Sequence, residues 1–145
     1  MSNFDTIQAI TTNLETVLKG LGAHFDRATY EDDANIPASL LPYGRIFYIG
    51  EIFEEISGER PAYIESEFNL WVTIGERDAQ KMIREQQRWI HSVRDGLTVN
   101  ALNIGDLASS KLISRVITDE ARMEQGSNEG VSSVVYSVRV RYREL

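Results

Sequence analysis

The two histidines are the side chains best suited to metal binding or proton transfer, but their spacing favours neither. His24 and His91 are the only histidines in the chain, and neither lies in an HExxH, HxH or HxxxH pattern that would place two ligands on one metal ion. The chain has no cysteine, which excludes thiolate ligands, thiol catalysis and disulfides. We therefore expect neither a metal nor a cofactor, and we interpret His91 as a boundary residue beside an apolar helical stripe.

Two pairs of carboxylates could in principle act as general acid and base. Glu54 with Glu55, or Glu65 with Glu67, would need burial to separate their pKa values, and nothing in the sequence indicates that burial. On a strand, Glu65 and Glu67 project from the same side, about 7 Å apart. We expect Glu65 and Glu67 to be solvated.

The remaining motifs that support chemistry are also weak. Asp32, Asp33 and Asn35 lack the glycine and the terminal glutamate of a calcium-binding EF-hand loop. No GxGxxG, GxxxxGK[ST] or GxSxG pattern occurs, so neither a phosphate-binding loop nor a nucleophile elbow of these kinds is present. We predict that the protein is not an enzyme. A buried carboxylate with a raised pKa, facing a cleft, would favour the opposite.

The one basic feature is a row of arginines near the C-terminus. Arg139, Arg141 and Arg143 share one face of a predicted strand, where they repel one another unless acidic groups oppose them. One hypothesis pairs them with glutamates of the same sheet. The other pairs them with the acidic segment 31–67 of a neighbouring copy, which would build a head-to-tail ring.

Length, charge and hydropathy limit the class of protein. The chain has 145 residues, of which 42% are hydrophobic, and we predict a single domain over 1–145. Residues 31–67 contain nine acidic residues against two arginines, which matches the net charge of −7 and disfavours a general grip on nucleic-acid phosphates. No basic stretch leads into an apolar run, and no eighteen apolar residues are consecutive, so we expect no export or membrane segment.

The first half of the chain predicts a helix, a long loop and a hairpin. Residues 2–22 have helical periodicity, a capping-box spacing at Ser2 and Asp5, and terminating glycines. Residues 23–42 predict a solvated loop. The strand at 45–56 has apolar side chains on both faces, so we expect it to be buried on both sides. The strand at 62–74 alternates cleanly, and the two form a long hairpin that projects.

The second half repeats this order and completes the fold prediction. Asp78 can cap a helix with an apolar stripe, whose members are Ala79, Met82, Ile83, Gln86, Trp89, Ile90, Val93 and Leu97. Strands at 111–123 and 131–145 form a second hairpin. The predicted fold class is α+β, with the order α-β-β-α-β-β: a four-stranded, mostly antiparallel sheet of two hairpins, with two main helices packed on one face.

This layout resembles the tail terminator and neck proteins of long-tailed bacteriophages, together with related tail-completion proteins. The resemblance covers nearly the whole chain and is one of pattern and size. It rests on the amphipathic helix 4–21 and on the segments PYGRIFYIGEIFEEI, AYIESEFNLWVTI, DAQKMIREQQRWIHSVRDGL and VVYSVRVRYREL.

The resemblance implies a ring, usually a hexamer, on the head-proximal end of the tail tube. Such a ring stops tube growth and joins the head connector, while DNA only passes through its lumen. The protein would then be found in the virion, and in the host cytoplasm during assembly. The implied partners are further copies of the chain, the tail tube protein and the head connector protein. The candidate interface residues are Glu31, Asp32 and Asp33 in the acidic loop, Glu59 and Arg60 in the hairpin tip, and Arg139, Arg141 and Arg143.

Two alternatives remain. One is a head-tail connector or another minor tail component with the same fold. The other is a small non-viral binding module, in which the sheet face around Trp71 receives a peptide or a small ligand.

Overall fold

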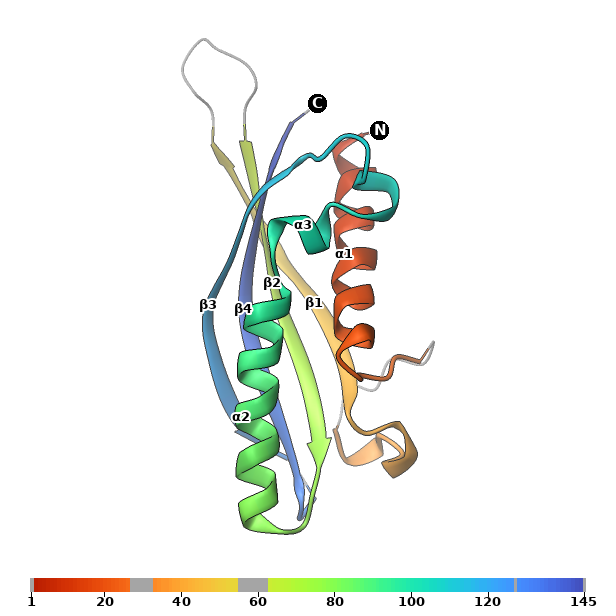
Figure 1. Cartoon of the computed structure of the whole chain (residues 1–145), viewed down its shortest axis with the longest axis vertical. Helices are drawn as coiled ribbons and strands as arrows, with labels where there is room; N and C mark the ends of the chain where they lie inside the picture. The colour runs from red at the N-terminus through yellow and green to blue at the C-terminus, as the bar shows by residue number, and fades with distance from the viewer. Residues whose placement is uncertain (1, 27–32, 55–62, 127, 145) are drawn as a thin grey trace.

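The computed structural model describes residues 2–26, 33–54, 63–126 and 128–144 (Figure 1). Within these residues the chain forms α1 (Asn3–Gly20), β1 (Tyr43–Glu54), β2 (Tyr63–Gly75), α2 (Ala79–Gly96), α3 (Val99–Leu102), β3 (Ile113–Gln125) and β4 (Val131–Arg143). The α+β class and the order of the main elements are confirmed. The short helix α3 was not predicted.

The sheet is held together by its two central strands. The strand order is β1-β2-β4-β3, and all three pairings are antiparallel. β2 and β4 pair without interruption from Tyr63 opposite Arg143 to Gly75 opposite Val131. The two hairpins therefore join through their second strands, which leaves β1 and β3 at opposite edges of the sheet.

The alternation along the central strands separates a core face from an open face. The helices lie over the core face (Figure 1). Apolar side chains of β2 and β4 point there and are at most 3% exposed: Ile64, Phe68, Leu70, Val72, Ile74, Val134, Tyr136, Val138, Val140 and Tyr142. They pack with Ile10, Leu14 and Leu18 of α1 and with Trp89 and Val93 of α2. Removing this apolar area from water is the main stabilising contribution.

The local signals predicted the first helix well. The Ser2 hydroxyl accepts from the Asp5 backbone N–H at 3.1 Å, and the Asp5 carboxylate accepts from the Ser2 backbone N–H at 3.1 Å. This reciprocal capping box satisfies N–H groups that have no partner within the helix. The helix ends at Gly20, and Gly22 adopts a positive φ of 109° just beyond it, a conformation that glycine adopts without steric cost.

The prediction for β1 was wrong in one respect, because β1 is an edge strand rather than a strand buried on both sides. Its beginning is buried at Tyr43 and Arg45, whereas Ile49 is 53% exposed and Phe53 is 68% exposed. An apolar run predicts a buried strand only when neighbours cover both faces, and here the helices leave the far end of β1 uncovered. Ile83 of α2, which was expected in the apolar stripe, is also exposed, at 53%.

A buried asparagine ties α1 to α3. Asn13 is 4% exposed, and its side-chain amide donates to the carbonyl oxygens of Leu102 at 2.8 Å and Ile104 at 3.0 Å. The Leu102 carbonyl ends α3 and the Ile104 carbonyl follows it, and the last carbonyls of a helix have no partner within the helix. One polar side chain therefore fixes the connection between α2 and β3 against the first helix.

We expect Asn13→Ala to lower the free energy of unfolding by about 1–3 kcal/mol, because it leaves two carbonyl groups without this donor. Urea denaturation monitored by circular dichroism measures the change. Thr12→Ala is the matched control, since Thr12 is an exposed neighbour on the same helix. Equal stability of the two variants would show that Asn13 is not a structural anchor.

Candidate interaction surface

The open face of the sheet carries the arginine row opposite acidic residues of the neighbouring strands. Here the register places Glu65 opposite Arg141, and Glu67 opposite Arg139. β4 lies between β2 and β3, so its arginines have access to acidic groups on both sides. The alternation of the sequence predicted this face correctly.

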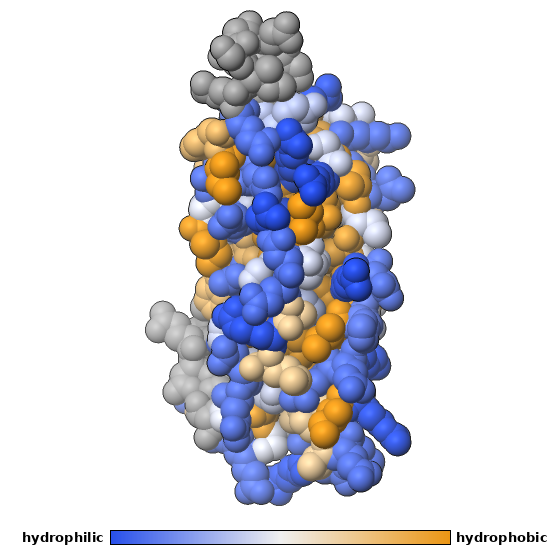
Figure 2. Space-filling model, turned by 90° about the vertical axis from the view of Figure 1, so that its left-hand side faces the viewer, coloured by the Kyte–Doolittle hydropathy of each residue, from blue (hydrophilic) through white to orange (hydrophobic). Residues whose placement is uncertain are grey.

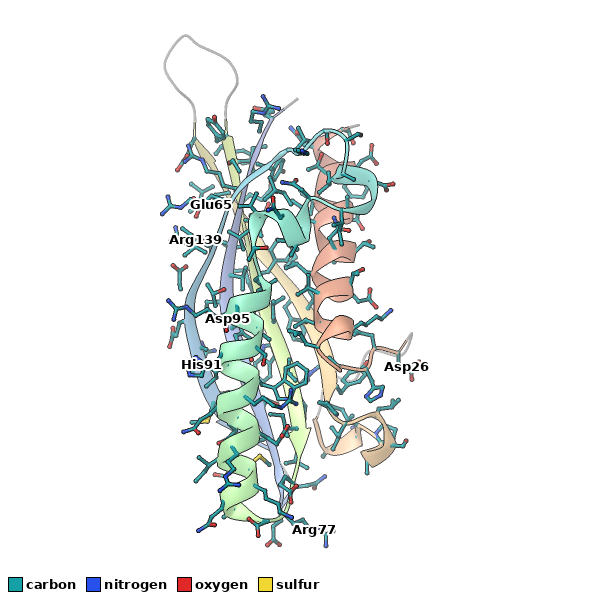
Figure 3. The ribbon with its side chains drawn as sticks, viewed as in Figure 1. Asp26, Glu65, Arg77, His91, Asp95 and Arg139 are labelled. Atoms are coloured by element: carbon teal, nitrogen blue, oxygen red, sulfur yellow. The ribbon has the colours of Figure 1, made fainter. Side chains whose placement is uncertain are left out.

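Arg139 bridges the two strands that flank it. Its guanidinium donates to Glu65 Oε1 of β2 at 2.7 Å, and in a bidentate arrangement to the Asp119 carboxylate of β3 at 2.6 Å and 2.9 Å. Figure 3 shows Glu65 and Arg139 side by side in the sheet. Glu65 was expected to be solvated, but it is only 8% exposed, because the bridging arginine covers it. Hydrogen bonds from Arg139 lower the pKa of Asp119 below its ordinary value.

Arg141 also finds its partner within the same chain. It forms an ion pair with Glu54 of β1 at 2.8 Å, and its guanidinium lies 4.1 Å from the centre of the Tyr63 ring, a favourable cation–π geometry. Arg143 is exposed and forms no ion pair among the described residues. For Arg139 and Arg141 the structure therefore agrees with the hypothesis of pairing inside the sheet.

The surroundings of Trp71 are filled by the protein itself. The Arg45 guanidinium lies 5.0 Å from the Trp71 ring centre, and the Phe47 ring contacts Trp71 edge-on at 6.2 Å. Arg45 also donates to the Thr73 hydroxyl at 3.2 Å. Stacked and bonded side chains occupy the position at which the binding-module alternative would place a ligand.

The other candidate interface residues are only partly described. Glu31, Asp32, Glu59 and Arg60 lie outside the described residues, as does the hairpin tip at 57–61. Asp33 begins a short 3₁₀ helix, Asp33–Asn35. A role for these residues at an interface stays a prediction.

The most unusual surface lies on the far half of β1. Five large apolar side chains are exposed there, and we call them the β1 apolar patch: Phe47 (37%), Tyr48 (52%), Ile49 (53%), Ile52 (47%) and Phe53 (68%). The register shifts at Ile49, between Tyr48 and Gly50, so the patch includes a β-bulge and presents side chains on both faces of the strand. Exposed apolar clusters of this kind usually mark a site of interaction.

Sequence reasoning missed this patch because it assigned the same residues to the core. The sequence signal was present, since apolar residues on both faces require two covering layers. What it lacked was the position of β1 in the sheet. A strand buried on both faces and an edge strand that binds a partner have the same apolar pattern.

Acidic and hydroxyl groups also meet on the core face of β1. Glu51 accepts from the Ser66 hydroxyl at 2.9 Å and from the Tyr142 hydroxyl at 3.2 Å. Burial is the main cause that raises the pKa of Tyr142 above its ordinary value, and the nearby Glu51 carboxylate raises it further. Both hydroxyls act as donors to a carboxylate, so this cluster is a satisfied hydrogen-bond network that ties β1 to the central strands.

An open groove of about 690 Å³ lies between the end of β2 and the β3–β4 turn; among its lining residues are Ile36, Leu41, Arg77 and Val131. Within the described residues no three histidine, aspartate or glutamate side chains are arranged to hold a metal ion. None of the described helices is both long and apolar enough to span a membrane.

Comparisons with known proteins found similarity in structure but none in sequence. No family model matches the chain, and no curated protein matches it in sequence. Among solved structures, the chain is similar to a chain of the "Virion of native gene transfer agent (GTA) particle", with a TM-score of 0.42 and 11% sequence identity. The similarity covers 94% of this chain and 92% of the other. At that score and identity it assigns neither a family nor a function.

The Arg139–Asp119 pair should make the stability of the fold sensitive to acid. Because the folded-state pKa of Asp119 lies below its ordinary value of about 3.9, the pair stabilises the fold at neutral pH and loses this contribution as the pH falls through that pKa. We expect Asp119→Asn to lower the free energy of unfolding by less than about 1 kcal/mol at pH 7, since the pair is partly exposed. In this variant the free energy of unfolding should fall less steeply as the pH decreases.

Urea midpoints measured between neutral and strongly acidic pH test this prediction. Glu124→Gln is the control, because it removes a more exposed ion pair, to Arg122 on the same strand. If both variants have the same acid dependence as the parent protein, the Arg139–Asp119 bridge contributes nothing to the pH response.

Proposed function

We propose that the protein is a structural subunit for virion assembly, which forms a ring at the head-proximal end of a phage-type tail tube. In this role it stops growth of the tube and joins the tail to the head connector. Its partners are further copies of itself, expected as a hexamer, together with the tail tube protein and the head connector protein. DNA only passes through the lumen.

The β1 apolar patch is the observation that carries this proposal. Its five side chains expose roughly 500 Å², if each fully accessible side chain presents about 200 Å². A standard protein–protein interface buries about 800 Å² on each partner, so the patch could form the apolar centre of one such contact. On a small chain, an exposed apolar surface of this size favours a contact with another protein over the binding of a small ligand.

The fold is consistent with the resemblance noted in the sequence. The order of helices and strands is the one expected of such a subunit, with both main helices on a single face of the sheet. One face and the two edge strands of the sheet remain available for contacts with other proteins. The acidic balance of the chain also suits a surface along which DNA slides without being held, because like charges repel at short range.

We expect concentrated protein to assemble into uniform rings with a central hole, visible by negative-stain electron microscopy. Light scattering on the same sample should give a mass several times that of the 16.4 kDa chain. Ile49→Lys should shift the protein to monomers, because it places a charge in the middle of the β1 apolar patch.

Thr16→Lys is the matched control, since it introduces the same charge at an exposed position on α1. Thermal unfolding of both variants verifies that each is folded. A strict monomer at every concentration would contradict a ring that assembles by itself, and rings formed by Ile49→Lys would contradict the role given to the β1 apolar patch.

A further inference from the structure

The two edges of the sheet differ in how they meet solvent. β1 presents the apolar patch, whereas β3 presents exposed polar and charged residues and is interrupted by two bulges, at Ser114 and Asp119. Free backbone groups along a sheet edge favour the addition of another strand, and the exposed apolar patch makes β1 the edge with the most apolar surface to cover.

The number and direction of the strands determine how one copy can meet the next. The sheet has four antiparallel strands, so β1 and β3 run in opposite directions at its two edges. If a second copy is added by rotation about an axis along the strands, its β3 lies antiparallel to β1 of the first copy. Such a contact joins two different surfaces and can repeat around a closed ring.

The rows of the sheet identify residues at the same height on the two edges. Phe47 pairs with Asn69, Asn69 with Ser137, and Ser137 with Glu120. In the same way, the rows from Phe47 to Phe53 lead to residues 113–120 of β3. The bulge residues Ile49 and Asp119 lie in nearly corresponding rows, so both edges are irregular at the same height.

On β3 the apolar side chains at the height of the patch are the partly buried Val116 and Ile117. Figure 2 looks onto the side of the molecule where β3 and α2 lie, and apolar surface interrupts its hydrophilic surroundings. On this side Met123 of β3 is 55% exposed and Ile83 of α2 is 53% exposed, and Met123 lies in the row of Gly44, outside the rows of the patch. A groove of about 410 Å³ between the two elements is lined in part by Met82, Gln86 and Met123.

From these observations we propose that the β1 edge of one copy pairs antiparallel with the β3 edge of the next copy, so that the sheet continues from subunit to subunit. The β1 apolar patch then packs against residues 113–120 of its neighbour's β3. This inference rests on the proposed ring and names the surface that builds it. The patch supplies roughly 500 Å² of the about 800 Å² that a standard interface needs on each partner.

The alternative occupant of the β1 edge is β1 of a second copy. That contact is two-fold symmetric and buries the patch against itself, but it consumes the edge in a closed dimer and leaves no surface for a cyclic ring. The two arrangements bring different residues together, so cross-linking distinguishes them.

Single cysteines offer a direct test, because the chain has none of its own. Phe47→Cys places a thiol on β1, and Ile117→Cys, Glu120→Cys and Arg122→Cys place one at open-face positions of β3, which allow for a shift of register in either direction. Within one chain the two edges are three strand spacings apart, about 14 Å. A disulfide requires Cα atoms closer than about 7 Å, so any bond must join two molecules.

Phe47→Cys, enlarged by an affinity tag, is mixed with each β3 variant under oxidising conditions. We expect a disulfide-linked heterodimer on a non-reducing gel for at least one β3 position. Each variant alone should give at least ten-fold less cross-linked product. Strong cross-linking of Phe47→Cys with itself would overturn the inference in favour of β1 pairing with β1.

Complementary assembly variants give a second, independent readout. Ile49→Lys disables only the β1 side, and Ile117→Lys disables only the β3 side, so each alone should be monomeric by light scattering. Their mixture should form a one-to-one dimer that cannot grow. A homodimer of Ile117→Lys alone would overturn the inference.

Failure of this inference can be told apart from failure of the proposed function. Rings of the parent protein, with no cross-link at any of the three β3 positions, would overturn the β1–β3 contact and leave the proposed function standing. Absence of rings at all concentrations would count against both.

Discussion

The pairing of β2 with β4 is the constraint on which the rest of the structure depends. These strands run antiparallel over thirteen residues each, and their alternation places mainly apolar side chains on one face and mainly charged or polar ones on the other. A shift of one residue would exchange the two faces. The buried side chains toward α1 and α2 therefore hold the register, and the register in turn determines which acidic group each arginine meets.

Electrostatics on the open face follow from that register. Arg139 lies between Glu65 on one side and Asp119 on the other, and Arg141 reaches Glu54 on the edge strand. Three like charges in a row would destabilise an isolated strand, but in this sheet two of them act as links across neighbouring strands. Each link is partly exposed and contributes little individually. Together they connect all four strands on a face that has no helix to cover it.

The same topology explains why β1 is left with an apolar surface. Because the hairpins join through β2 and β4, their first strands become the edges, and α1 covers only part of β1. A polar edge would suit a chain that works alone. An apolar edge on one side and a bulged, charged edge on the other suit a subunit whose contacts join two different surfaces.

The sequence by itself determined the local elements of this protein. The capping box at Ser2 and Asp5, the cap at Asp78, the alternation of β2 and β4 and the order of helices and strands could all be predicted, since each depends on neighbours within a few residues. Only the tertiary structure decided that Glu65 is covered by Arg139, that Asn13 anchors α3, and that the apolar residues of β1 are exposed. These outcomes depend on which distant strands become neighbours. An apolar run records that a surface must be covered, but it does not record whether the cover comes from the same chain or from another.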